Sequence, residues 1–191
     1  MAVQLHLPAV DVRATAAPRH LEAERLYLRE VRTADVNDTY HRWMNDPDVT
    51  RYLESRFYPS SMEGIADFVA SLRGDRNNVF LAIMIKQDHR HIGNIKLGPI
   101  NWIHRTADIG LLIGEKDCWG QGYAAEAIRC LRGYAFSVLN LHKLTASCYD
   151  CNLGSARAFL KAGFHQEGTR KEQFFCEGRY VDQVLLGLCN T

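Results

Sequence analysis

Apolar residues alternate with polar ones along several stretches of the chain, and they recur three and four positions apart along others. The first pattern is typical of strands and the second of helices. The predicted strands are residues 25–31, 79–86, 91–98, 105–114, 142–149, 164–175 and 180–189. The predicted helices begin at Thr33, at Ser60 or Ser61, at Gly122 and at Asn152. The order β-α-α-β-β-β-α-β-α-β-β, without repeats, predicts one α/β domain with a mixed sheet.

The first 22 residues carry no sustained apolar segment, because Pro8, Asp11 and Arg13 interrupt the pattern. They do not resemble a secretory signal. We therefore expect residues 1–22 to be a loosely ordered lead-in, residues 23–191 to form the domain, and the protein to be cytoplasmic. The longest apolar run, residues 79–85, is too short to cross a membrane and predicts a buried strand.

The net charge of +1 and the absence of a Lys/Arg run argue against nucleic-acid binding through bulk charge. Among the six cysteines, Cys148 and Cys151 form a CxxC that could be a redox pair or half of a zinc site. No second CxxC and no HxxxH supplies the other two zinc ligands. Reduced, unconnected thiols and no metal are the favoured interpretation.

Residues 118–127 read CWGQGYAAEA and lie between a strand and a long helix. A glycine loop at a helix N-terminus gathers unpaired backbone N–H groups, and the helix dipole adds about half a positive charge there. Such a loop suits a phosphate or pyrophosphate. The alternative is a glycine-rich turn that only starts a buried helix.

The sequence from Gly120 to Ala125 also fits the dinucleotide pattern GxGxxG/A, with Asp150 as a candidate ribose-binding acid. That pattern should begin directly after a strand and open a doubly wound sheet. Here residues 115–119 separate the strand from the first glycine, and a long α and antiparallel β region precedes it. A dinucleotide-binding oxidoreductase is therefore disfavoured.

A second motif, NLGSARAFLKAGF at residues 152–164, follows the glycine loop at a characteristic distance. Together the two motifs resemble the cofactor motifs of the GNAT acetyltransferases, and the resemblance covers residues 25–188. It is strongest to the branch that includes the ribosomal-protein N-terminal acetyltransferases RimJ and RimL. It implies a mostly antiparallel sheet, splayed between the fourth and fifth predicted strands (105–114 and 142–149) and flanked by about four helices.

The resemblance further implies acetyl-CoA as co-substrate, bound in the opening between those two strands. Main-chain groups of the fourth strand would pair with the pantetheine arm, the glycine loop would hold the pyrophosphate, and Asn152 would bond a pantetheine amide as well as capping its helix. The family often has Arg or Gln where Trp119 stands, so a charge contact is lost there. The implied cofactor-binding residues are Leu111, Leu112, Ile113, Trp119, Gly120, Gln121, Gly122, Tyr123, Ala124, Ala125, Asn152 and Ser155.

Many GNAT enzymes place a tyrosine at the eighth position of the second motif as the proton donor to sulfur, whereas this chain has Phe159. The resemblance implies that Ser155 takes that role, although a helix serine can also bond its own backbone. A backbone N–H near Leu112 would hold the oxyanion. Asp108 shares a strand face with Leu112 and is our first candidate for the base, unless it is held in an ion pair. Weaker candidates for the base are His104, Tyr149 and Glu172.

The expected function is direct transfer of an acetyl group from acetyl-CoA to a primary amine. An α-amine with a pKa of about 8 is roughly one-tenth neutral at pH 7, whereas a lysine is less than about a thousandth neutral. An uncertain base therefore favours an α-amine or a sugar amine over a lysine side chain as acceptor. The resemblance favours a protein N-terminus as acceptor. Amino-sugar nucleotides, small amines and a non-catalytic CoA-binding module remain alternatives. Residues 51–61, 101–105 and the last hairpin should form the acceptor site, in a monomer or homodimer.

Overall fold

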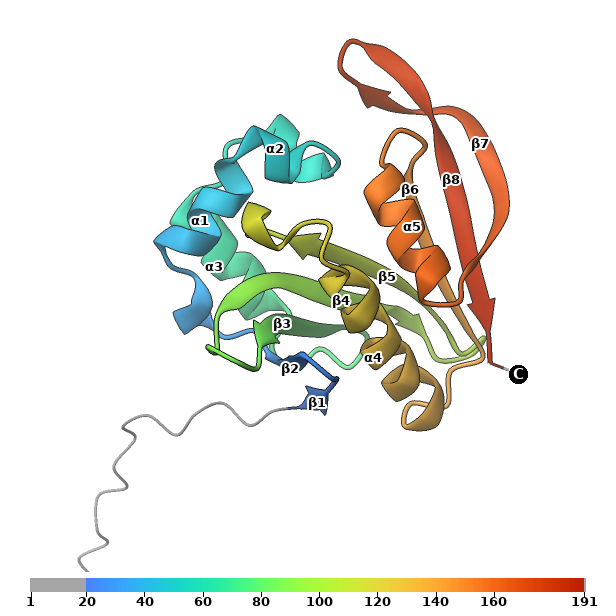
Figure 1. The fold of residues 1–191 in the computed structure, drawn as a ribbon, viewed down its shortest axis with the longest axis horizontal. Helices are drawn as coiled ribbons and strands as arrows, with labels where there is room; N and C mark the ends of the chain where they lie inside the picture. The colour runs from blue at the N-terminus through green and yellow to red at the C-terminus, as the bar shows by residue number, and fades with distance from the viewer. Residues whose placement is uncertain (1–19, 191) are drawn as a thin grey trace, which may run out of the picture.

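The computed structural model describes residues 20–190 of the 191-residue chain. Its centre is an eight-stranded sheet in the order β1-β2-β3-β4-β5-β6-β8-β7 (Figure 1). Only β5 and β6 are parallel; the other neighbouring pairs are antiparallel. The predicted mixed, mostly antiparallel sheet is confirmed. The strands are β1 (Leu21–Glu22), β2 (Leu26–Glu30), β3 (Val79–Ile85), β4 (His91–Asn101), β5 (Thr106–Ile113), β6 (Lys143–Tyr149), β7 (His165–Cys176) and β8 (Arg179–Cys189).

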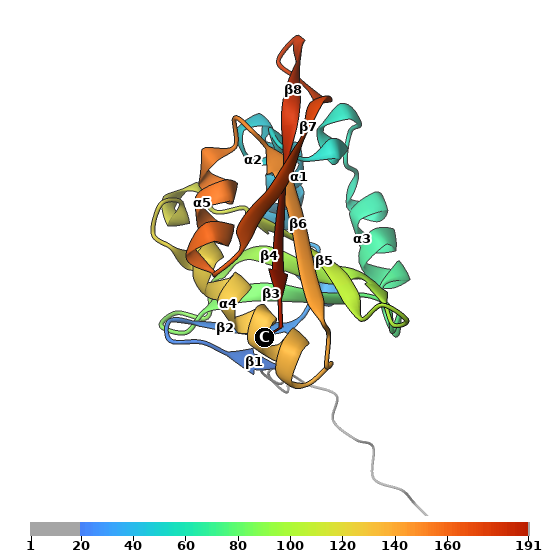
Figure 2. The ribbon, with the colours of Figure 1, turned by 90° about the vertical axis from the view of Figure 1, so that its right-hand side faces the viewer.

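Five α-helices cover the two faces of the sheet, as the edge-on view in Figure 2 shows. The core clusters place α4 (Tyr123–Ser137) and α5 (Leu153–Lys161) on one face, and α1 (Asp38–Asn45), α2 (Pro47–Thr50) and α3 (Met62–Ser71) on the other. Figure 2 shows α4 and α5 on the opposite side from α3. A hydrophobic core lies on each face of the sheet, because successive side chains along a strand point to opposite faces. Leu26 and Leu28 of β2 belong to the cluster that includes Ile128 of α4, whereas Tyr27 belongs to the cluster with Trp43 of α1.

The first helix does not begin at Thr33, as the sequence predicts. Residues 33–35 form a short 3-10 turn, η1, because the Asp35 carboxylate accepts hydrogen bonds from both terminal nitrogens of Arg29 at 2.7 Å and from the Arg32 N–H at 2.7 Å. The helix α1 begins after Asn37, whose side chain accepts hydrogen bonds from the backbone of Thr39 and Tyr40. The N-cap at Ser61 of α3 is as predicted.

The sheet begins at Leu21, within the segment that the sequence predicts as a lead-in. Leu21 and Glu22 form β1, which pairs with Leu28 and Tyr27 of β2. Residues 1–19, the rest of that segment, lie outside the described residues. All six cysteines of the chain are described, and each is free.

The strands β5 and β6 diverge after a short parallel ladder. They pair only at Thr106, Ala107 and Asp108 with Lys143, Leu144 and Thr145. Beyond that point β5 stays with β4 as far as Ile113, and β6 stays with β8 as far as Tyr149. This is the predicted separation of the two strands, and it opens the sheet between its two halves.

Candidate active site

A cavity of about 1410 Å³ passes through the opening between β5 and β6. Its walls include residues 108–113 of β5 and residues 147–149 of β6. On one face of the sheet it is bounded by the glycine loop and α5, and on the other by α1, α3 and residues 51–55. We call these two parts the loop half and the helix half of the cavity. A ligand in this cavity would extend from one face of the sheet to the other.

The glycine loop has the backbone that a phosphate cradle requires. Gly120 and Gly122 have φ angles of 74° and 83°, in the left-handed region that favours glycine, and Gly122 is the N-cap of α4. The first N–H groups of α4 are therefore presented at the loop. Of the predicted cofactor-binding residues, all except Gln121 line the cavity; the Gln121 side chain instead donates to the carbonyl of Asp117 at 2.5 Å.

Arg25, which sequence reasoning did not single out, fastens this loop to the sheet. Its Nε donates to the Glu126 carboxylate at 2.8 Å, its Nη1 donates to the Gln121 carbonyl at 3.1 Å, and its guanidinium lies 4.5 Å from the ring centroid of Tyr123. Glu126 is buried and also accepts the backbone N–H groups of Arg25 and Leu26. Because 96 to 101 residues separate these partners, no local pattern reveals the contact.

Trp119 departs from the usual Arg or Gln of the family, and its indole has a structural partner. The indole Nε1 donates to the carbonyl of Ile113 at 2.8 Å, which ties the loop to the last residue of β5. That carbonyl is therefore already bonded, although the sequence predicts main-chain groups of residues 111–113 to be available to a cofactor. The loop half still carries positive charge at a different position, because Arg157 and Lys161 of α5 line the cavity.

The start of α5 places both of its predicted residues at the cavity. Asn152 is the N-cap of the helix, and its Oδ1 accepts the backbone N–H of Ser155 at 3.1 Å. The capping role expected of Asn152 is therefore present. Ser155 lines the cavity one turn along the helix. Phe159, at the position where the family resemblance led us to look for a tyrosine, also lines the cavity and packs against Phe164.

Asp108 lies in the helix half, at the last paired position between β5 and β6. Its Oδ1 accepts a hydrogen bond from the Thr145 hydroxyl at 3.0 Å, and it makes no ion pair within residues 20–190. The carboxylate faces the open cavity, yet protein surrounds it. Although its side chain is exposed to the cavity, desolvation by the surrounding protein raises the pKa of Asp108, while the Thr145 hydrogen bond and the charge of Lys96 oppose the rise. A raised pKa makes the carboxylate a better proton acceptor.

The three weaker candidates for the base differ in whether they line the cavity. Tyr149 lines the cavity, whereas His104 and Glu172 do not. The Tyr149 hydroxyl accepts a hydrogen bond from Arg56 at 3.0 Å, and its ring stacks on Phe174 with centroids 4.2 Å apart. Of these three residues, only Tyr149 is placed to meet a ligand of the cavity.

Residues 51–57 close one side of the helix half by crossing to the C-terminal hairpin. Arg56 donates to its own segment at the Leu53 carbonyl, 2.8 Å away, and to the hairpin at the Phe175 carbonyl, 2.5 Å away. Arg51 forms an ion pair with Glu177 at 2.6 Å. We call this crossing, residues 51–57 with their contacts to residues 174–177, the strap. The sequence predicts both segments as parts of the acceptor site. It does not predict the contact between them, because Arg56 and Phe175 lie 119 positions apart.

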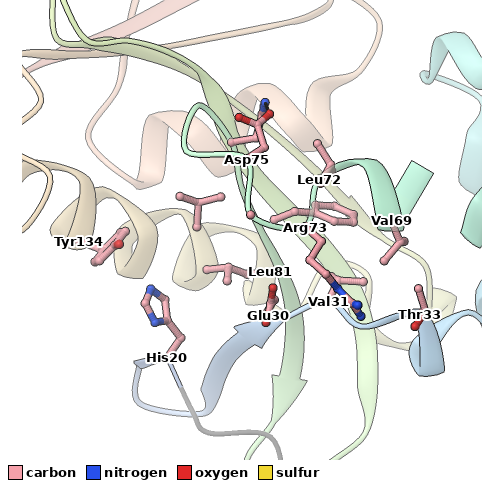
Figure 3. Close-up of a pocket in the computed structure, with 14 residues that line it drawn as sticks. His20, Glu30, Val31, Thr33, Val69, Leu72, Arg73, Asp75, Leu81 and Tyr134 are labelled. Atoms are coloured by element: carbon pink, nitrogen blue, oxygen red, sulfur yellow. Dashed lines mark hydrogen bonds between the residues drawn. The ribbon is translucent and has the colours of Figure 1, made fainter. Parts of the chain in front are cut away.

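A second, smaller cavity of about 310 Å³ lies away from the opening between β5 and β6 (Figure 3). Its walls include His20, Glu30 and Leu81, together with Arg73 beyond the end of α3 and Tyr134 of α4. No residue predicted for the cofactor or for catalysis lines it. Within residues 20–190, no group of three or more His, Cys, Asp and Glu side chains is placed to hold a metal ion. No described helix has the length and apolar character to span a bilayer.

The comparisons with known proteins agree with this architecture. The family model of the GNAT acetyltransferase domain matches residues 25–165. The probable N-acetyltransferase YjcK of Bacillus subtilis is 35% identical over 179 residues, covering 89% of this chain and 97% of the relative. The spermidine N(1)-acetyltransferase of Escherichia coli K12 is 28% identical over 164 residues, covering 86% of each. The crystal structure of spermidine N-acetyltransferase from Vibrio cholerae, in complex with CoA and spermine, superposes with a TM-score of 0.78 at 27% identity, covering 86% of this chain and 95% of that one.

Fold, glycine loop and cavity thus define an acyltransferase that uses acetyl-CoA. The chain belongs to the GNAT family of N-acetyltransferases. The predicted family, fold and co-substrate are confirmed, whereas the RimJ/RimL-like branch stays a prediction beside these spermidine acetyltransferases.

Proposed function

We propose that this enzyme acetylates a small primary amine that enters the helix half of the cavity. The observation that carries the proposal is the position of Asp108, a carboxylate without an ion pair in the described chain, inside a half that the strap encloses on one side. The spermidine acetyltransferases among the relatives also act on small amines. A protein N-terminus, which the sequence predicts, would need a groove along which its chain could leave.

In the proposed reaction Asp108 takes a proton from the acceptor ammonium as the amine becomes the nucleophile. The amine nitrogen forms a bond to the thioester carbonyl carbon, and the backbone N–H near Leu112 stabilises the oxyanion. When the C–S bond breaks, the nitrogen releases its second proton to solvent, and the Ser155 hydroxyl gives a proton to the CoA thiolate and regains one from solvent. The products are the N-acetyl amine and CoA.

In the loop half we assign the pyrophosphate to the backbone N–H groups of residues 120–125. This assignment rests on the left-handed glycines and the N-terminus of α4. We assign the pantetheine arm to the main chain of Leu111, which faces the opening because its neighbour Leu112 pairs with Asn94 of β4, and to Asn152. We also propose a cytoplasmic location, consistent with six free cysteines.

The test is release of CoA thiol with a panel of acceptors. The panel contains apolar monoamines, amino acids, spermidine, an amino-sugar nucleotide and a short peptide with a free N-terminus. Turnover of a small amine with a kcat/KM above that of the peptide supports the proposal. Preference for the peptide would instead favour the N-terminal acceptor, and preference for the nucleotide would favour the amino sugar. No turnover with any amine, despite CoA binding, would favour a non-catalytic module.

A further inference from the structure

Apart from the effect of its charge on Asp108, Lys96 has no role in the site described so far. It lies on β4 directly opposite Gly110 of β5, which has no side chain to cover it. Its neighbours Ile95 and Leu97 pack in the core on the α4 side, so Lys96 points to the face of Asp108 and Leu112. It is partly buried and lines the cavity, and it has no ion-pair partner among residues 20–190.

The other charged residues that line the helix half either form ion pairs or are exposed to solvent. Asp48 is paired with Lys116 at 2.9 Å and Arg51 with Glu177 at 2.6 Å. Glu54 is exposed on η2 (Glu54–Phe57). The inner part of this half therefore presents one positive group, Lys96, and one negative group, Asp108. A polyamine such as spermidine would bring several positive charges toward Lys96.

The separation of these two groups restricts what can bind between them. Asp108 lies two residues from Gly110, the partner of Lys96, so the two side chains are diagonal neighbours with Cβ atoms about 7 Å apart. They are close on the sheet and yet form no ion pair with each other. A molecule whose ammonium and carboxylate groups are joined through one carbon can meet both side chains at once.

Serines contribute to the remaining walls of the helix half, but the part formed by α1 and α3 is largely apolar. The apolar residues include Tyr40, Val49 and Ile65, which are buried in the cluster of the α1 and α3 side, and Met44 and Phe68. Such walls suit an apolar side chain, because burying it removes about 25 cal/mol of unfavourable hydration for each Å² covered.

We propose that the acceptor is an α-amino acid with an apolar side chain, whose carboxylate binds Lys96 while its amine lies against Asp108. This proposal rests on the proposed function, because it assigns the acceptor to the same half of the cavity. It makes Lys96 a residue that selects the acceptor by charge and takes no part in bond making. It also separates this enzyme from the spermidine acetyltransferases it resembles.

The experiment compares phenylalanine with phenethylamine, which lacks only the carboxylate, in the wild type and in Lys96→Met, which keeps the length of the stem. A charge-assisted hydrogen bond to the carboxylate predicts that Lys96→Met lowers the ratio of kcat/KM for phenylalanine to kcat/KM for phenethylamine by about tenfold or more. Any effect of the lost charge on the Asp108 base is shared by both acceptors and cancels in this ratio. Because the same two acceptors are compared in two enzymes, their different amine pKa values cancel. Lys96→Arg should retain the selectivity for phenylalanine.

Equal losses for both acceptors, or no loss for either, would overturn the assignment of Lys96. An unchanged KM for acetyl-CoA in Lys96→Met shows that the variant is folded and limits the effect to the acceptor. In Lys96→Glu, activity with spermidine should rise while that with phenylalanine falls. If the wild type acetylates phenethylamine and spermidine but never phenylalanine, this inference fails and the proposed small-amine function stands.

Discussion

Asp108 illustrates how the surroundings of a single side chain change its chemistry. It belongs to an ordinary ladder position on β5, but the ladder ends there and leaves the carboxylate facing the cavity. Desolvation by the surrounding protein raises its pKa, whereas salt-bridged surface carboxylates such as Asp117 have a lowered pKa because a cation holds them. Asp108 is therefore a stronger proton acceptor than an ordinary exposed aspartate.

We expect Asp108→Asn to lower kcat by about 10²- to 10⁴-fold, because the amide cannot accept the proton of the acceptor. In the wild type, activity should fall as the pH drops through the raised pKa of Asp108, since the protonated carboxyl is no longer a base. That part of the pH–rate profile should be absent from the variant. Asp67→Asn, on the exposed part of α3 outside the cavity, is the control. Full activity in Asp108→Asn would rule this residue out as the base.

Ser155→Ala should lower kcat by about tenfold or more with little change in the KM for acetyl-CoA, because only protonation of the leaving thiolate is affected. Steady-state kinetics with acetyl-CoA and one amine measure both constants. Ser147→Ala is a matched control, since this serine also lines the cavity but lies on β6. A kcat that changes equally in both variants would show that Ser155 has no special part in the reaction.

At the scale of helices and strands, local patterns predicted most of the fold. The periodicities located the long strands and α3, α4 and α5 to within a few residues, and the two motifs indicated nearly all residues around the glycine loop. The helix start at Thr33 was wrong, because Asp35 bonds to Arg29 of β2 and ends the turn early. The two-residue strand β1 was missed, since so short a segment carries no periodicity.

The contacts that complete the site could not be predicted, because each joins distant parts of the chain. Arg25 and Glu126 are 101 residues apart, and Arg56 and Phe175 are 119 apart. Lys96 belongs to a segment whose sequence predicts a strand but does not mark Lys96 as a site residue. Its relation to Asp108 depends on the register between β4 and β5, which a single sequence does not reveal.

The contact of Arg25 with the glycine loop and α4 leads to a prediction about how these segments are held together. Arg25→Met should raise the KM for acetyl-CoA severalfold with little effect on kcat, because the Gln121 carbonyl and Glu126 lose the donor that holds the loop. Arg25 is partly exposed, so the loss of stability should be about 1 kcal/mol. Steady-state kinetics and denaturant unfolding measure the two effects. Arg129→Met removes a positive charge from the exposed side of the same helix and should change neither. A similar KM shift in both variants would point to general electrostatics.

At the scale of the whole molecule, the opening between β5 and β6 divides the sheet into two halves. The first half holds β1 to β5 and the second holds β6, β8 and β7. They are joined by the three-residue ladder, by contacts between α4 and α5, and by the strap. The acetyl donor, in the proposed complex, lies between the halves and contacts both.

Hydrogen exchange should therefore respond to CoA across the opening. We expect slower exchange on CoA binding at Leu111 and Ile113 of β5, whose N–H groups face the opening, and at residues 120–125 of the loop, because these groups acquire acceptors. Residues 81–83 of β3, already paired on both sides, should not change and serve as the internal control. Mass spectrometry of peptides after exchange measures both. Protection confined to the loop would contradict pairing of the pantetheine with β5.

The divergence of β5 and β6 also places two edge strands in the middle of the sheet. Past Asp108 each strand offers backbone N–H and C=O groups to any extended chain, a property that folded proteins usually protect because it promotes aggregation. In the proposed complex the co-substrate covers one of these edges as a removable strand would. The supply of acetyl-CoA would then govern how well the enzyme resists self-association as well as how fast it works.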